Sequence, residues 1–139
     1  SESFGADRPV LVCEPGRALC GDAYATAAKV KAVRDDTHVF LNDGLYGSLF
    51  ELGQIGIIDR IEVLDSAGHK RTGPVHGKIV FGPTCDSVDR LPGDVPLPDD
   101  IAEGDFVVFQ GMGAYSTVTN SRFNGFGELQ MATVLSLRV

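Results

Sequence analysis

One segment of this sequence has the residue types best suited to catalysis or ligand binding. In it a cysteine stands beside an aspartate, and a second aspartate follows three positions further on. The segment reads GPTCDSVD at 82–89 and contains Cys85, Asp86 and Asp89. A positioned thiol can donate a proton to a reacting group, and a carboxylate can bind a cation. Composition alone favours the opposite interpretation, in which Cys85 is a small, buried, apolar side chain.

The residues before this segment predict that it forms a loop. The run 78–81 (KIVF) is typical of a strand, and Gly82-Pro83 ends it because proline fixes its own φ and disfavours helical backbone in the preceding residue. Cys85 and Asp86 should therefore lie at a strand end, where a rigid scaffold positions reactive groups. Together with the motifs below, this favours chemistry over a buried cysteine.

Two glycine-containing motifs could bind an anion. In EPGR at 14–17, Gly16 permits close backbone approach, Arg17 offers a forked donor for phosphate, and Glu14 can hold a proton on a heterocyclic nitrogen. In GMGAY at 111–115, two glycines precede the hydroxyl of Tyr115. The alternatives are an ordinary Pro-Gly turn for the first motif and a glycine bulge with Tyr115 in the core for the second.

Aromatic residues mark two further turns. Tyr46 lies in NDGLYGS at 42–48, which is a turn signal first and a possible tyrosine contact second. Phe123 and Phe126 flank Asn124-Gly125, where they could form a satellite hydrophobic cluster or a subunit contact. For Phe126 the hydrophobic cluster is the favoured interpretation.

Short runs between turns predict a mostly β domain with a tail. Seventeen glycines and seven prolines separate apolar and alternating runs within 139 residues, a length that suits one domain. Residues 65–74 should form a solvated hairpin loop. Residues 91–100 should form an extended surface loop, because their prolines exclude a helix or a central strand. A barrel or sandwich is expected. The predicted strands are 8–13, 23–33 (with a helical first turn as an alternative), 37–41, 56–64, 77–81, 104–110 and 129–139.

The net charge and the residue types limit which classes of binding partner, cellular location and metal site are expected. A formal charge of −7 and a pI near 4.8 argue against nucleic acid and favour a cationic substrate or partner. No run of ~18 apolar residues and no signal peptide is present, so a soluble, cytoplasmic protein without membrane contact is expected. Cys13, Cys20 and Cys85 lack disulfide or zinc spacing, and the three histidines are scattered, so we expect free thiols and no metal.

Taken in order, the five motifs EPGR, NDGLYGS, GPTCDSVD, GMGAY and RFNGF (122–126) resemble the fold-III pyridoxal-phosphate decarboxylases that act on ornithine and lysine. The resemblance covers nearly the whole chain but only the C-terminal part of that family. It implies a β-barrel or sandwich domain of the alanine racemase/ornithine decarboxylase type. Residues 1–22 would be the last segment of a (β/α)8 barrel, and residues 23–139 the β-domain.

The resemblance also implies a cofactor and partners. In this family a barrel lysine carries pyridoxal 5'-phosphate as a Schiff base, and no lysine of this chain matches that motif. We therefore expect a domain, a cleaved fragment or one half of a nicked enzyme that needs the missing N-terminal barrel segment. A homodimer partner with shared active sites is implied as well. The implied reaction converts ornithine to putrescine, with lysine to cadaverine as a second reaction, in polyamine biosynthesis.

The resemblance also implies roles for individual residues in the motifs. Cys85 looks like the residue that reprotonates the α-carbon from across the dimer interface, and Asp86 like the carboxylate that accepts the distal ammonium of the substrate. Tyr46 and Phe123 match positions that line the substrate end and the interface.

A second set of residues resembles the family's cofactor contacts. Glu14 looks like the carboxylate that pairs with the pyridinium nitrogen. Gly16, Arg17 and Tyr115 match contacts to the cofactor phosphate.

At two places the sequence differs from related decarboxylases, and other functions therefore stay possible. After Ser48 the chain reads LFELGQI at 49–55, where eukaryotic ornithine enzymes offer another acidic substrate contact, so lysine could be accepted too. The Cys85-Asp86 pair differs from the Cys-Glu that is typical of diaminopimelate decarboxylases, which remain an alternative. The other alternative is a non-catalytic β-domain used for dimerisation or regulation, which predicts loss of Cys85 or Asp86.

Overall fold

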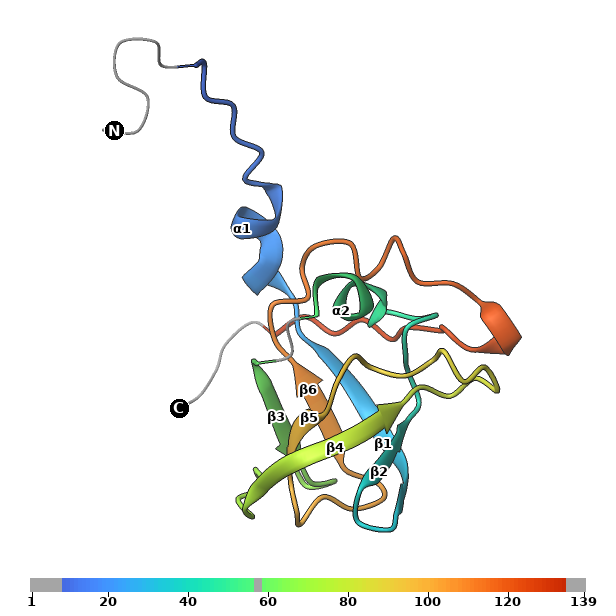
Figure 1. The fold of residues 1–139 in the computed structure, drawn as a ribbon. Helices are drawn as coiled ribbons and strands as arrows, with labels where there is room; N and C mark the ends of the chain where they lie inside the picture. The colour runs from blue at the N-terminus through green and yellow to red at the C-terminus, as the bar shows by residue number, and fades with distance from the viewer. Residues whose placement is uncertain (1–8, 57–58, 135–139) are drawn as a thin grey trace.

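Short strands curve into one six-stranded sheet that is nearly closed into a barrel (Figure 1). The computed structural model describes residues 9–56 and 59–134. The strand order is β3-β6-β1-β2-β4-β5, and the two end strands β3 and β5 contact each other. The strands are β1 (Thr26–Arg34), β2 (His38–Leu41), β3 (Ile61–Leu64), β4 (Val75–Phe81), β5 (Val95–Pro98) and β6 (Phe106–Phe109).

Alternating side chains turn one face of the sheet into the core. In β1, Ala28 and Val30 are buried while Lys29 and Lys31 point outward, the period-2 pattern of a half-buried strand. All neighbouring strands are antiparallel except β2 and β4, which are parallel. Because β2 and β4 run in the same direction, the loops that follow them leave the same edge of the sheet.

Most of the predicted strands are confirmed. The runs 37–41, 56–64 and 104–110 contain β2, β3 and β6, while 23–33 and 77–81 overlap β1 and β4, which extend one residue further at the end and two residues further at the start, respectively. The last turn before β1 is a 3-10 helix at Gly21–Ala23. Residues 49–55 contain a helix that the sequence did not predict, α2 (Phe50–Ile55), which Gly56 ends in left-handed conformation with a φ of 67°.

Two predicted strands are wrong. Residues 9–15 form no strand, and Val10 and Val12 are 92% and 85% exposed, since no described strand lies beside them. Figure 1 shows this segment and α1 (Gly16–Cys20) extending away from the sheet. Residues 129–134 also form no strand; Arg8 and residues 135–139 lie outside the described part of the chain.

Residues 91–100 are not an extended surface loop, because they contain β5. Val95 and Leu97 are fully buried, and Val95 pairs with Lys78 on β4. Pro96 and Pro98 are tolerated because β5 ends the strand order and has only β4 as a ladder partner.

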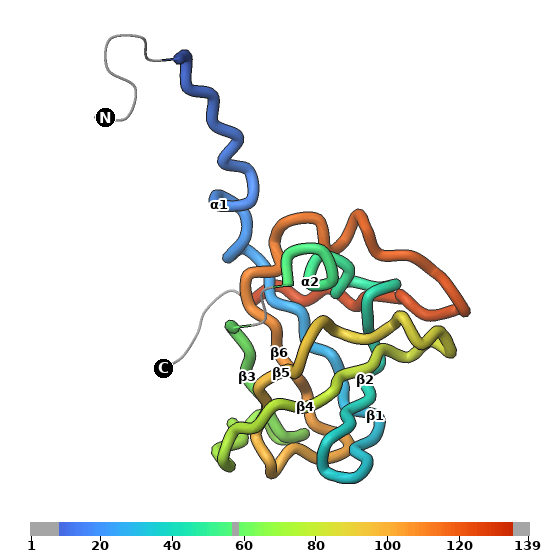
Figure 2. Tube along the Cα trace, in the orientation of Figure 1, coloured from blue at the N-terminus to red at the C-terminus, as the bar shows by residue number. Residues whose placement is uncertain are grey.

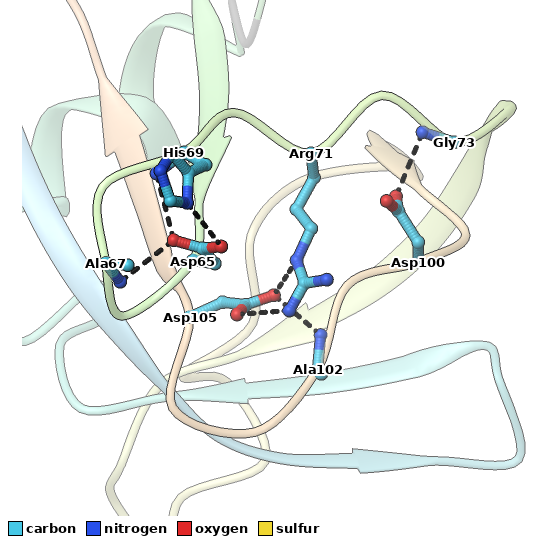
Figure 3. A network of polar contacts seen from close by, with 8 residues as sticks. All are labelled: Asp65, Ala67, His69, Arg71, Gly73, Asp100, Ala102 and Asp105. Atoms are coloured by element: carbon cyan, nitrogen blue, oxygen red, sulfur yellow. Dashed lines mark hydrogen bonds and ion pairs between the residues drawn. The ribbon is translucent and has the colours of Figure 1, made fainter.

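The hairpin predicted at 65–74 is confirmed only in its first part, where Leu64 pairs with Lys70 in antiparallel fashion and the Arg71 N–H donates to the Val63 carbonyl at 2.8 Å. The connection does not join β3 to β4 as a hairpin, because β3 pairs with β6 while β4 pairs with β2 and β5. Figure 3 shows its polar contacts: Asp65 accepts from the backbone of Ala67 and His69, and Arg71 reaches the buried Asp105. The Arg71 Nε and Nη2 atoms each lie 2.9 Å from an Asp105 oxygen. Arg71 thereby fastens the connection to the turn before β6.

Candidate active site

The loops after β2 and β4, together with the chain after β6, bring four predicted residues into one cluster. The Tyr46 hydroxyl donates to Asp86 Oδ2 at 2.5 Å, and the Tyr46 ring stacks on Phe123 with centroids 4.4 Å apart. Cys85 is exposed next to Asp86, and its Sγ lies 3.2 Å from Asn124 Nδ2. The interpretation of Cys85 as a buried apolar side chain is therefore wrong.

The chain after β6 supplies the third wall of this cluster. It crosses to the side of the molecule where the other two loops lie (Figure 2), and the backbone N–H of Ser121 donates to the Tyr46 carbonyl at 3.0 Å. A short 3-10 helix at Phe123–Gly125 then places Phe123 on Tyr46 and Asn124 on Cys85. Asn124 was missed in the sequence, although its place between Phe123 and Gly125 in RFNGF was a signal. Phe126 is 42% exposed and lines a small pocket with Phe123.

Hydrogen bonds favour the charged form of Asp86. Its pKa lies below the ordinary value, first because Tyr46 donates to it and second because the Val88 backbone N–H does. The same bond raises the pKa of Tyr46, which therefore stays a neutral donor. The cluster presents a carboxylate and a thiol beside an aromatic surface, a combination suited to a ligand with an ammonium group and an acceptor for a proton.

A second cluster forms where α1 meets the chain after β6. The Arg17 guanidinium lies 5.2 Å from the centre of the Tyr115 ring and is paired with Glu51 of α2. Tyr115 has a φ of 66° and is 56% exposed, so the alternative that places it in the core is wrong. Glu14 and Gly16 are exposed at the start of α1. The structure thus joins Arg17 and Tyr115, but among the described contacts it does not join Glu14 to them.

The donors of the second cluster fit a phosphate group. Arg17 uses one nitrogen on Glu51, its side chain is 44% exposed, and a Cβ placed on Gly16 would meet nothing within 4 Å. An anion can therefore approach the guanidinium and the backbone of the first α1 turn. Arg17 and Glu51 also border a pocket of about 160 Å³, and none of its described lining residues is a lysine.

In the described ranges, 9–56 and 59–134, no group of three or more His, Cys, Asp or Glu residues is arranged to hold a metal. No helix in those ranges is long and apolar enough to cross a membrane. Cys13, Cys20 and Cys85 are all free thiols.

Asp43 is a buried carboxylate in the loop after β2, and it makes the stability of the protein depend on pH. Burial raises its pKa, although Ser48 Oγ and the backbone N–H groups of Gly44 and Ser48 donate to it. A folded pKa above the unfolded value means that stability is lost as pH rises from about 4 through the folded pKa. Asparagine can keep the same bonds without the charge, since Ser48 Oγ can accept from its amide.

We therefore expect Asp43→Asn to gain stability relative to the parent chain as the pH rises. The measurement is the thermal midpoint of both proteins between pH 4 and pH 8. The difference between them should be small at pH 4 and grow with pH. A difference that stays constant across this range would contradict the assignment.

Together, the nearly closed sheet, the Arg17–Tyr115 cluster ahead of it and the thiol–carboxylate cluster at its edge fit the sheet domain of a pyridoxal-phosphate enzyme. Comparison with known families agrees, because the model for "Pyridoxal-dependent decarboxylase, C-terminal sheet domain" matches residues 11–113. The chain belongs to this family of pyridoxal-dependent amino-acid decarboxylases and corresponds to their C-terminal sheet domain.

Individual relatives carry more specific names. The chain is 35% identical to the chloroplastic ornithine decarboxylase of Nicotiana glutinosa over 94% of its own length and 32% of that protein. It is 31% identical to antizyme inhibitor 2 of Xenopus laevis over 84% of its length and 28% of that protein. The solved lysine/ornithine decarboxylase of Vibrio vulnificus, complexed with cadaverine, superposes with a TM-score of 0.70 at 31% identity, covering 86% of this chain and 32% of that one. The chain thus spans about a third of the length of these relatives.

Proposed function

We propose that this chain supplies the β-domain and the cross-interface residues of a decarboxylase that makes putrescine from ornithine and cadaverine from lysine. The observation that carries the proposal is the Tyr46–Asp86 hydrogen bond beside the exposed Cys85. A carboxylate held in its charged form next to a thiol suits a substrate that has an ammonium group at one end and a protonation step at the other. The acidic net charge of the chain agrees with a cationic substrate.

The second cluster would hold the cofactor. Pyridoxal 5'-phosphate, when bound, supplies an electron sink for the electron pair left by the departing carbon dioxide. Arg17, the Gly16 backbone and the Tyr115 hydroxyl would bind its phosphate, and Glu14 would hold a proton on its ring nitrogen. Binding the phosphate would compete with the Arg17–Glu51 ion pair seen here.

Cys85 would act after carbon dioxide has left. Its S–H bond breaks, the proton forms a new C–H bond at the α-carbon, and the thiolate regains a proton from solvent, to which Cys85 is exposed. Asp86 would hold the distal ammonium, and the stacked rings of Tyr46 and Phe123 would line the methylene part of the substrate.

The proposal includes the arrangement of the parent protein. Residues 1–22 would complete the cofactor-binding barrel, and residues 23–139 would form the β-domain. The exposed apolar side chains Val10, Leu11 and Leu19 support this, because large apolar groups of this kind are normally covered by another part of a protein. A second copy of the protein would receive Cys85 and Asp86 in its active site.

The proposal that lysine is accepted as a substrate is based on the position of the acidic residue in α2. That residue, Glu51, lies beside Arg17 in the cofactor cluster and not in the Tyr46–Asp86 cluster. Without a second carboxylate fixed at the ammonium end, the site would discriminate weakly between substrates that differ by one methylene.

A non-catalytic β-domain is the second candidate, and the relative named as an antizyme inhibitor favours it. Both Cys85 and Asp86 are present here and lie together, as an active site requires. The two candidates differ in what Asp86 does: in the first it binds the substrate, while in the second no substrate is turned over.

Asp86→Asn in the complete enzyme tests the proposed function. We expect the KM for ornithine and lysine to rise roughly 10- to 100-fold, the value of one hydrogen bond to a charged group. Steady-state release of labelled carbon dioxide measures it, with Asp65→Asn in the distant β3–β4 connection as a matched control. An unchanged KM, or no carbon dioxide release by the parent enzyme, would overturn the proposal.

A further inference from the structure

The Asp89 side chain lies between the two loops that carry the substrate cluster, and the residue is only 1% exposed. Its Oδ1 atom accepts from the backbone N–H of Leu45 at 2.7 Å. Its Oδ2 atom accepts from the Thr84 backbone N–H at 3.1 Å and from the Thr84 hydroxyl at 2.8 Å. One carboxylate thus holds the residue before Tyr46 and the residue before Cys85.

Glycines on both loops make room for this carboxylate. A Cβ added to Gly44 would lie 2.2 Å from Asp89 Oδ1, and one added to Gly82 would lie 2.3 Å from both Asp89 oxygens. Neither glycine has a positive φ, so space rather than backbone conformation requires glycine at these two positions. The loops are therefore closed around Asp89.

The neighbouring buried carboxylate, Asp43, is bonded differently. It accepts from Gly44 and Ser48, which lie in its own loop. Asp43 shapes one loop, whereas Asp89 joins two loops that are about forty residues apart in sequence.

We propose that Asp89 is a positioning residue for the substrate site, because it locks the Tyr46 loop to the Cys85-Asp86 loop. The inference rests on the function proposed for Cys85 and Asp86. Asp89 itself touches neither side chain through a described hydrogen bond, so it acts through the backbone. Its lock keeps the Tyr46 hydroxyl on Asp86, which in turn fixes where Asp86 and Cys85 face the substrate.

Asparagine distinguishes the two carboxylates. At position 89 an amide NH₂ must face a backbone N–H, of Leu45 or of Thr84, whichever way it is turned. Two donors then oppose each other, and a buried group loses its partner. At position 43 the amide can face Ser48 Oγ, which accepts, so Asp43→Asn is the matched control.

The first readout is the pKa of Tyr46, followed by phenolate absorbance on the complete protein and assigned with Tyr46→Phe. We expect it to fall toward the ordinary tyrosine value in Asp89→Asn and to stay raised in Asp43→Asn. Gly82→Ala separates the effect of the position of Asp89 from the effect of its charge, because this variant keeps the carboxylate but displaces it. Gly82→Ala should also lower the pKa of Tyr46.

The second readout is kinetic. Asp89→Asn should raise the KM for ornithine about tenfold or more and lower kcat as well, because both Asp86 and Cys85 lose their place. A parent enzyme without decarboxylase activity would refute the proposed function, while the Tyr46 titration would still test the lock.

Circular dichroism establishes that each variant is folded. If Asp89→Asn or Gly82→Ala fails to fold, Thr84→Val removes one of the three bonds and should lower the Tyr46 pKa by a smaller amount. A Tyr46 pKa that matches the parent protein in the folded variants would overturn the inference.

Discussion

Replacing Cys85 by alanine in the complete enzyme is expected to slow amine formation about 100- to 10,000-fold, the usual contribution of a positioned general acid. The reason is that the α-carbon would lose its proton donor after carbon dioxide has left. Carbon dioxide release should fall less than amine formation, so the product profile should shift to compounds in which the proton has been added at an atom other than the α-carbon. Cofactor binding should not change, because Arg17 and Tyr115 lie in the other cluster.

Chromatography of the products, together with the visible absorbance of the bound cofactor, measures both effects. Cys13→Ala is the control for removing a thiol, since Cys13 is also a free cysteine but lies before α1, outside the Cys85 cluster. Cys85→Ser should recover part of the activity, because a hydroxyl can also donate a proton. An unaltered product profile in Cys85→Ala would remove the role proposed for Cys85.

Gly113→Ala is expected to reduce the free energy of unfolding by about 3 kcal/mol, the upper part of the usual range for overpacking. A Cβ at position 113 would lie 1.7 Å from the Cys20 carbonyl oxygen, and backbone atoms cannot move aside as a flexible side chain can. The same place holds the hydrogen bond from Gly113 N–H to the Gly21 carbonyl at 2.8 Å. Because this junction connects the Arg17 segment to the Tyr115 segment, cofactor affinity should fall together with stability.

Urea unfolding measures the first effect. Gly21→Ala is the control at the same junction, since its Cβ would meet only the Gly111 carbonyl at 3.9 Å and Gly21 has an ordinary helical φ of −50°. Its free energy of unfolding should stay within about 0.5 kcal/mol of the parent chain. Equal losses in the two variants would show that steric contact with Cys20 is not the cause.

Much of the sheet could be predicted from local patterns. The alternation of Lys29, Val30 and Lys31 and the turn after Leu41 depend on neighbours in sequence, and β1 and β2 follow them. Val95 and Leu97 also alternate, but the prolines between and after them hid β5, whose place at the end of the sheet makes prolines acceptable.

Other errors have a tertiary cause. Val10 to Val12 look like a strand covered on both faces, and a strand requires a partner that the described residues do not contain. The six-residue helix α2 contains a glycine and no side-chain cap, so its local signal was weak. Its burial against the rest of the domain, through Leu52, is a property of the folded chain.

The candidate site was predictable as motifs and not as an arrangement. Cys85, Asp86 and Tyr46 stand out by residue type and by their turns. The place of Asp89 between two loops depends on the parallel pairing of β2 and β4. The contact of Asn124 with Cys85 depends on where the chain after β6 crosses these loops. A sequence without its register does not show which loops share an edge of the sheet.

The central claim is that Cys85 and Asp86 of one subunit serve the active site of another, and mixing two inactive variants of the complete enzyme tests it most directly. One variant carries Cys85→Ala, and the other lacks the cofactor-binding lysine of the barrel. If the sites are shared, half of a random mixture is heterodimer with one intact site of two, so about a quarter of the parent activity should return. If differently tagged subunits exchange and no activity returns, although the parent enzyme is active, the two clusters do not meet across an interface and the account is wrong.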